Sequence, residues 1–125
     1  ITGTTKTKIT PQVLGVYNIT LRLQFANTDT SDEYDVDVWL KKNDVDVAAT
    51  NNVYTIPKKH TGGNGQAVVS TRFQVEFENE GDYVEIVWHT PSSTVFMEHI
   101  DPQTSPIRPE TPSAIVTVSF VSALP

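Results

Sequence analysis

Apolar and polar residues alternate strictly along several stretches of the chain. In residues 16–25 every second side chain is apolar, and the same period of two runs through residues 34–41, 69–77 and 84–88. This period is typical of antiparallel strands that are buried on one face. No window repeats apolar residues at helical spacing, so the pattern predicts an all-β chain.

Shorter β-prone stretches complete the expected architecture. They cover residues 4–9, 53–56, 94–99 and 114–122, between frequent prolines and glycines. We therefore expect about eight short antiparallel strands. That number in one domain predicts two packed sheets, in a jelly roll or another Greek-key β-sandwich.

The connections between these strands fall into recognisable types. Asn43-Asp44 suits a tight hairpin turn, because both residue types tolerate positive φ. Residues 60–65 form a glycine-rich loop, and residues 101–112 carry four prolines, which predicts an extended crossover and not a central strand. We expect residues 1–12 to form an N-terminal lead-in or docking arm, and residues 13–125 to form a single jelly-roll domain.

Composition narrows the classes of function. The 125 residues suit one domain, and the absence of cysteine excludes disulfides and thiolate chemistry. The net charge of −6 argues against a nucleic-acid partner, which needs a basic face. No stretch approaches the roughly 20 apolar residues of a membrane span.

Candidate metal ligands are few and do not form a known motif. His89 and His99 fall on neighbouring predicted strands, where they could bind a metal together with Glu98 or Asp101. The acidic run Asp29–Asp37 offers oxygen ligands for calcium, but its spacing does not match the EF-hand loop, and a solvated strand edge is the favoured interpretation. We predict no catalytic residues and no cofactor, with calcium as the open alternative and a glycan hydrolase or metal-dependent enzyme as the competing class.

A few residues are candidates for binding a ligand. Trp39 and Tyr83 are aromatic residues on faces that the alternation places outward, where they can stack on sugars or anchor an interface. His60 and Asn64 lie in the glycine-rich loop and would be displayed with it. These residues support a soluble carbohydrate-binding module as an alternative function.

The last predicted strand is apolar on both faces. Ile115 and Val121 share one face, and the other face holds Val116, Val118 and Phe120. A strand of this kind must be covered on both sides, and in one small domain the second cover is often another subunit. Ile115 and Val121 are therefore candidates for a subunit interface, as are Tyr83 and Val87, which share another outward face.

Three short motifs follow one another in a recognisable order. They are P-x-x-x-G-V-Y-N-I-x-L-x-L-x-F from Pro11, V-W-L-K-K-N-D from Val38 and G-D-Y-V-E-I from Gly81. Together they resemble the C1q/TNF-like jelly-roll family over residues 9–121, with Asp44 where that family usually has glycine. The resemblance implies a non-enzymatic homotrimer with its last strands near the threefold axis, and calcium in some members.

A second, narrower resemblance concerns where the protein is expected to act. The stretches F-A-N-T-D, P-K-K-H-T-G-G-N-G and T-S-P-I-R-P-E-T-P-S-A-I-V-T-V are similar to those of small structural proteins of tailed bacteriophages. This resemblance implies a virion surface protein, either a capsid decoration or the head of a fibre. Its expected partners are other copies of the chain, capsid or tail proteins, and a host surface glycan.

Overall fold

The computed structural model describes residues 8–125, and it confirms that the chain is all-β with antiparallel sheets. No helix that could cross a membrane occurs in this part of the chain. Of the predicted strand at residues 4–9, residues 4–7 lie outside the described range. Ile9 forms an isolated bridge with Val84.

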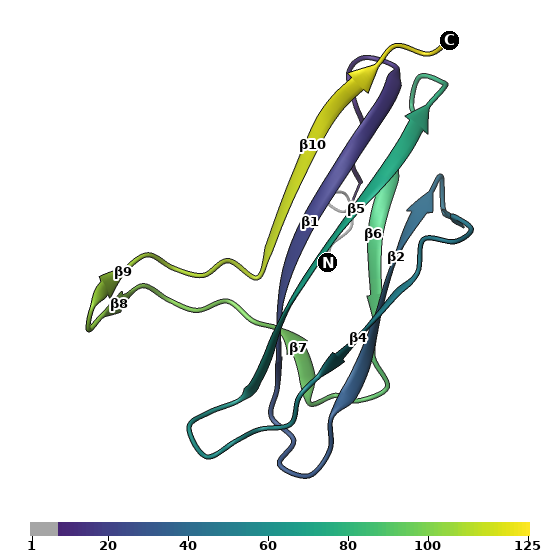
Figure 1. The fold of residues 1–125 in the computed structure, drawn as a ribbon. Helices are drawn as coiled ribbons and strands as arrows, with labels where there is room; N and C mark the ends of the chain where they lie inside the picture. The colour runs from purple at the N-terminus through teal and green to yellow at the C-terminus, as the bar shows by residue number, and fades with distance from the viewer. Residues whose placement is uncertain (1–7) are drawn as a thin grey trace.

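Two main sheets and one small hairpin make up the fold (Figure 1). The first sheet contains β1 (Gly15–Asn27), β5 (Gly65–Phe77), β7 (Val95–Met97) and β10 (Ala114–Ser122). The second sheet contains β2 (Tyr34–Lys42), β3 (Val45–Asp46), β4 (Asn52–Ile56) and β6 (Val84–His89). The hairpin pairs β8 (Gln103–Thr104) with β9 (Ile107–Arg108).

Each main sheet is built around one long strand. β5 pairs with β1 along its whole length, while β10 and then β7 pair with the opposite edge of β1. In the second sheet, β6 pairs with one edge of β2, while β4 and β3 share the other. β1 and β2 therefore lie at the centre of their sheets, and their alternating sequences give the two facing apolar layers.

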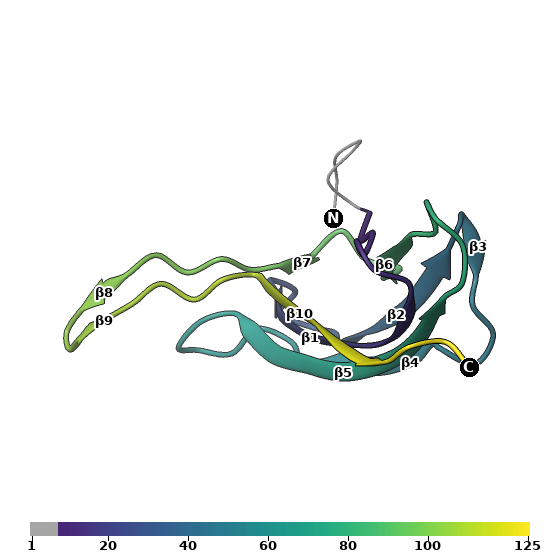
Figure 2. The same ribbon diagram turned by 90° about the horizontal axis from the view of Figure 1, so that it is seen from above.

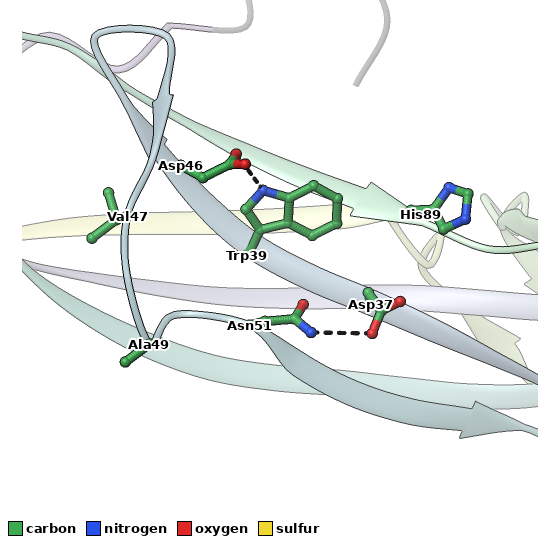
Figure 3. Close-up of a pocket in the computed structure, with 7 residues that line it drawn as sticks. All are labelled: Asp37, Trp39, Asp46, Val47, Ala49, Asn51 and His89. Atoms are coloured by element: carbon green, nitrogen blue, oxygen red, sulfur yellow. Dashed lines mark hydrogen bonds between the residues drawn. The ribbon is translucent and has the colours of Figure 1, made fainter.

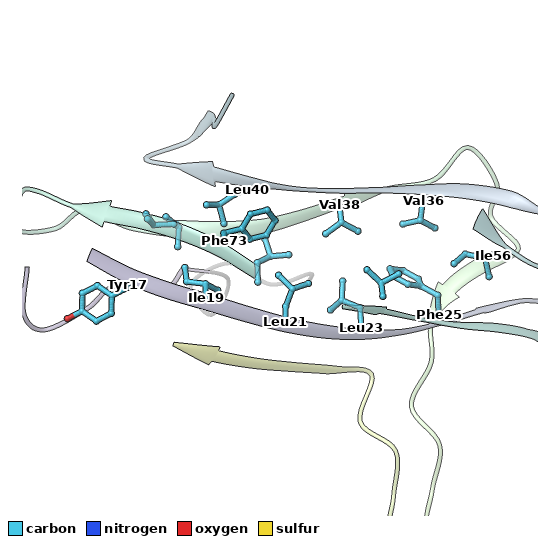
Figure 4. Close-up of a cluster of buried hydrophobic side chains, with 14 of the residues drawn as sticks. Tyr17, Ile19, Leu21, Leu23, Phe25, Val36, Val38, Leu40, Ile56 and Phe73 are labelled. Atoms are coloured by element: carbon cyan, nitrogen blue, oxygen red, sulfur yellow. The ribbon is translucent and has the colours of Figure 1, made fainter. Parts of the chain in front are cut away.

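The core lies between β1 and β2 (Figure 4). Ile19 and Leu21 of β1, and Val36 and Val38 of β2, have no exposed surface. Burying a side chain of this size stabilises the fold by about 1.5–3 kcal/mol. Because the outward residues between them are polar, one register satisfies both strands, and a slip by one residue would expose the whole apolar set.

The predicted turn at Asn43-Asp44 connects two parts of the second sheet. Both residues have positive φ, 50° and 67°, which asparagine and aspartate tolerate better than most residues. Asn43 Nδ2 donates to Asp82 Oδ1 at 3.0 Å, and the backbone N–H of Tyr83 donates to Asn43 Oδ1 at 3.1 Å. Two of the motifs that carry the family resemblance thus meet in one hydrogen-bond network, and Asp44 adopts a conformation that favours glycine.

The proline-rich segment 101–112 differs from the expected crossover. It contains the β8–β9 hairpin, and each of its two short strands lies between prolines. Within the described residues β8 and β9 pair with each other and with no other strand. Figure 2 shows the hairpin extending away from the sandwich as a narrow arm. The prolines keep this segment out of the main sheets, but they leave two dipeptides free to pair locally.

Candidate functional site

A shallow pocket of about 430 Å³ lies around Trp39 on the outward face of the second sheet (Figure 3). Its walls come from β2, β3, the end of β6 and the loop between β3 and β4. The residues that line it are Asp37, Trp39, Asp46, Val47, Ala49, Asn51 and His89. The alternation of β2 places Asp37 and Trp39 here, because Val36, Val38 and Leu40 face the core.

Hydrogen bonds hold the polar wall of this pocket. Trp39 Nε1 donates to Asp46 Oδ1 at 2.8 Å, and Asn51 Nδ2 donates to Asp37 Oδ1 at 3.2 Å. The Thr50 hydroxyl braces the loop by donating to the Val47 carbonyl at 2.8 Å and accepting from the Leu40 backbone N–H at 3.1 Å. An indole face bordered by carboxylate and amide oxygens suits a ligand that carries several hydroxyl groups.

The other candidate ligand-binding residues are not part of this pocket. Tyr83 precedes β6, where the Lys8 ammonium lies 4.3 Å from the centre of its ring. A hydrogen bond to Asp44 raises the pKa of the Tyr83 phenol. His60 and Asn64 belong to the β4–β5 loop, where His60 Nδ1 accepts from the Gly62 backbone N–H at 3.1 Å. Of the four candidates, only Trp39 lines the pocket.

The candidate metal ligands lie in two different places. His89 ends β6 in the second sheet, opposite Asp37. His99 follows β7 of the first sheet, where its Nε2 lies 2.7 Å from Glu110 Oε2 and its Nδ1 lies 3.6 Å from Asp101 Oδ1. Glu110 raises the pKa of His99. The prediction that the two histidines fall on neighbouring strands is wrong, since β6 and β7 belong to different sheets.

Asp29, at the start of the acidic run, is occupied by local hydrogen bonds. Asp29 Oδ1 accepts from the backbone N–H groups of Ser31 and Asp32 at 2.7 and 3.1 Å, and Asp29 Oδ2 accepts from the Tyr34 hydroxyl at 3.0 Å. These bonds lower the pKa of Asp29. Within residues 8–125 no three histidine, aspartate or glutamate side chains are grouped so as to hold a metal ion.

Asp82 has a similar structural role, which the sequence did not reveal. Its Oδ2 accepts from the backbone N–H groups of Glu78 and Asn79 at 3.0 Å each, in addition to the bond from Asn43. The Asn43 amide is the largest cause of the lowered pKa of Asp82, with the nearby Lys42 ammonium contributing least. A carboxylate that accepts several N–H bonds at a turn holds the backbone of that turn, and these bonds stabilise its ionised form.

The four candidate interface residues lie on both sheets. Tyr83 and Val87 are on or beside β6 of the second sheet, whereas Ile115 and Val121 are on β10 of the first. Ile115 and Val121 are 44% and 45% exposed. The structure therefore does not bring the four residues together into one surface.

The other face of β10 is also exposed, contrary to its expected place in the core. Val116, Val118 and Phe120 pair with Leu21, Ile19 and Tyr17 of β1 and so point to the same side of the sheet. They are nevertheless 37%, 40% and 54% exposed, because the extensive contacts of β10 are with β1 alone. The sequence carries a signal for this edge, since residues 113–125 contain no charged side chain.

No family model, curated protein or solved structure matches the chain.

Proposed function

We propose that this chain is a non-enzymatic structural protein of the virion surface of a tailed phage, acting as a homotrimer. It would decorate the capsid or form the head of a fibre, in particle stabilisation or attachment. The observation that carries the proposal is β10, a nine-residue edge strand that is largely exposed on both faces and has no charged residue.

An edge strand of this kind is unusual in a protein that stays monomeric. Natural sheets protect their edges with charges, prolines or bulges, because an open edge pairs with other chains. β10 has one register irregularity near its end, beside Val121, but no charge and no proline. In the second sheet the edge strands β6 and β3 carry charges, Glu85 and Asp46, and only the short edge strand β4, of five residues, has none. The contrast supports assembly through β10.

The family resemblance supports three copies and a jelly-roll connection of the strands. In C1q/TNF-like domains the last strands pack near the threefold axis, and β10 is the last strand here. Three copies on one particle would raise avidity without any single tight site, which is the mechanism we propose for attachment. The lead-in at residues 1–12 would dock to the particle, starting from Ile9, which is bonded to Val84.

Analysis of purified particles tests this role. We expect peptides of this chain in purified virions of the phage that encodes it, in multiples of three copies. Antibodies raised against the folded chain should label the outer surface in electron micrographs. Peptides that occur in the infected lysate but are absent from purified particles would overturn the proposal.

A second candidate function is glycan binding at the Trp39 pocket. What favours it is the indole ring beside Asp37, Asp46 and Asn51 (Figure 3). A glycan array followed by calorimetry tests it: Trp39→Ala should abolish saturable binding, while Tyr83→Ala, outside the pocket, should leave it intact. Purely structural decoration predicts that the unmodified chain binds no sugar on the array.

A further inference from the structure

The arm comprises residues 100–111, including the β8–β9 hairpin, and is held together by its own contacts. Ile100 and Thr111 exchange two backbone hydrogen bonds, at 3.0 and 2.8 Å, and β8 pairs with β9 beyond them. Next to this pair, His99 Nε2 and Glu110 Oε2 lie 2.7 Å apart. The arm is therefore a defined hairpin with a paired base.

The arm carries an apolar side chain at its far end. Ile107 is 89% exposed, the highest value among the large exposed hydrophobic residues. Figures 1 and 2 show that the arm leaves the sandwich beside the start of β10 and points away from it. Ile107 therefore does not turn back onto β10 of its own chain.

A matching surface exists elsewhere on the same chain. Val116, Val118 and Phe120 form an uncovered strip on the core-facing side of β10, which we call the β10 strip. The Phe120 and Tyr17 rings meet edge to face at 5.4 Å, so the strip continues the apolar layer of β1. Its three side chains remain partly exposed to solvent.

The size of β10 indicates that it does not form an interface alone. The β10 strip consists of three side chains that are 37%, 40% and 54% exposed, so it offers only a fraction of the roughly 800 Å² that each partner contributes to a stable interface. A second contacting element is needed, and the arm is the projecting element of the described chain.

Charge favours a second copy of the chain as the occupant. Copies with a net charge of −6 repel one another, so they can approach most closely through uncharged surfaces. Residues 102–107 of the arm and residues 113–125 around β10 contain no charged side chain. Since one chain offers both the arm and the strip, head-to-tail contacts between copies can close into a ring.

We propose that the arm of each copy crosses onto the β10 strip of a neighbouring copy, with Ile107 packed against Val118. This inference rests on the proposed self-assembly and names the surfaces that form it. The neighbour's arm would cover the apolar face that the second sheet leaves open, and would add to the contact that β10 makes alone.

Cysteine cross-linking between separate chains tests the contact, because the chain has no cysteine of its own. Ile107→Cys and Val118→Cys variants are prepared singly, mixed and oxidised mildly. We expect disulfide-linked heterodimers on a non-reducing gel. The matched control pairs Ile107→Cys with Val53→Cys, which is 58% exposed on β4 of the other sheet. Equal cross-linking in both mixtures would overturn the proposal.

A charge substitution separates this inference from the proposed assembly itself. Ile107→Asp should raise the dissociation constant of the oligomer by about tenfold or more, with the thermal unfolding of the dissociated chain unchanged. Val45→Asp, a 67% exposed position on β3, should leave both unchanged. If the unsubstituted chain assembles and Ile107→Asp assembles equally well, only the arm contact is refuted; if the unsubstituted chain never assembles, the proposed assembly fails too.

Discussion

β1 and β10 are neighbouring strands with similar apolar patterns, yet they have different surroundings. Leu21 on β1 and Val116 on β10 are direct partners and face the same side of the first sheet. Leu21 has no exposed surface, whereas Val116 is 37% exposed. Residues 116–120 of β10 alternate as β1 does, so the difference comes from what covers each strand, and β10 has extensive contacts with β1 alone.

This difference separates two kinds of apolar residue in one layer. Those on β1 stabilise the fold of a single chain, because the second sheet covers them. Those on β10 leave apolar surface in water, which association with another chain would remove. The molecule thus divides into a closed body and an open margin, which consists of β10 and the arm.

The largest effect on folding should come from Leu21, the buried member of the paired residues Leu21 and Val116. Leu21→Ala should lower the free energy of unfolding by about 2–5 kcal/mol, because it leaves a cavity in a fully buried site. Val116→Ala should cost less than about 1 kcal/mol, because its site is already open to solvent. Urea unfolding of both variants at a concentration too low for association checks this, and equal losses would contradict the division.

The largest effect on association should come from the centre of the β10 strip. Val118→Asp should raise the dissociation constant of the oligomer by about a hundredfold, because the contact would bury an unpaired charge. Sedimentation velocity measures this value, with Val53→Asp on the second sheet as the matched control. An oligomer that tolerates Asp at position 118 as well as at position 53 would place the interface elsewhere.

Acid should weaken the body through Asp82. The folded state holds its pKa below the ordinary value of 3.8, so the stability it contributes is fully present above that value and is lost as the pH falls through the folded pKa. Asp82→Asn should therefore reduce the fall in the urea midpoint as the pH drops from neutral to below 3.8. The exposed Glu80→Gln serves as the control. Asp29 remains in both variants, with its own lowered pKa, and keeps part of the slope. A slope unchanged by Asp82→Asn would refute the role of Asp82.

The smallest effect should occur at the base of the arm. Glu110 and Asp101 face His99 and raise its pKa above 6.5. The protonated imidazole therefore stabilises the base of the arm fully below pH 6.5. This stabilisation is lost as the pH rises through the pKa of His99 in the folded chain. Both side chains of the closer pair are about half exposed, so the contribution is small. NMR titration should show a lower His99 pKa in Glu110→Gln. An unchanged titration would mean that the 2.7 Å contact does not persist in solution.

Local pattern predicted most of the body. Strict alternation located β1, β2 and β5, because one buried and one solvated face leave a period of two in the sequence. The Asn43-Asp44 turn followed from residue type, and its positive φ values confirm it. Trp39 was correctly placed on an outward face, where it lines the pocket.

The local sequence pattern did not predict how distant segments of the chain are arranged. Periodicity gives the face of a strand but not how far the opposite sheet extends, so the open side of β10 was missed. Proline excluded residues 101–112 from the main sheets but did not indicate that the two dipeptides between prolines would pair. The placement of β6 and β7 in different sheets, which puts His89 and His99 on strands that do not pair, is not determined by sequence order.

Native mass spectrometry of the unsubstituted chain at low micromolar concentration tests the central claim most directly. If β10 and the arm join copies of the chain, the dominant species has three times the single-chain mass of 13.8 kDa and dissociates on dilution. A folded species with the mass of one chain at every concentration would contradict the account, because β10 would then remain uncovered in solution.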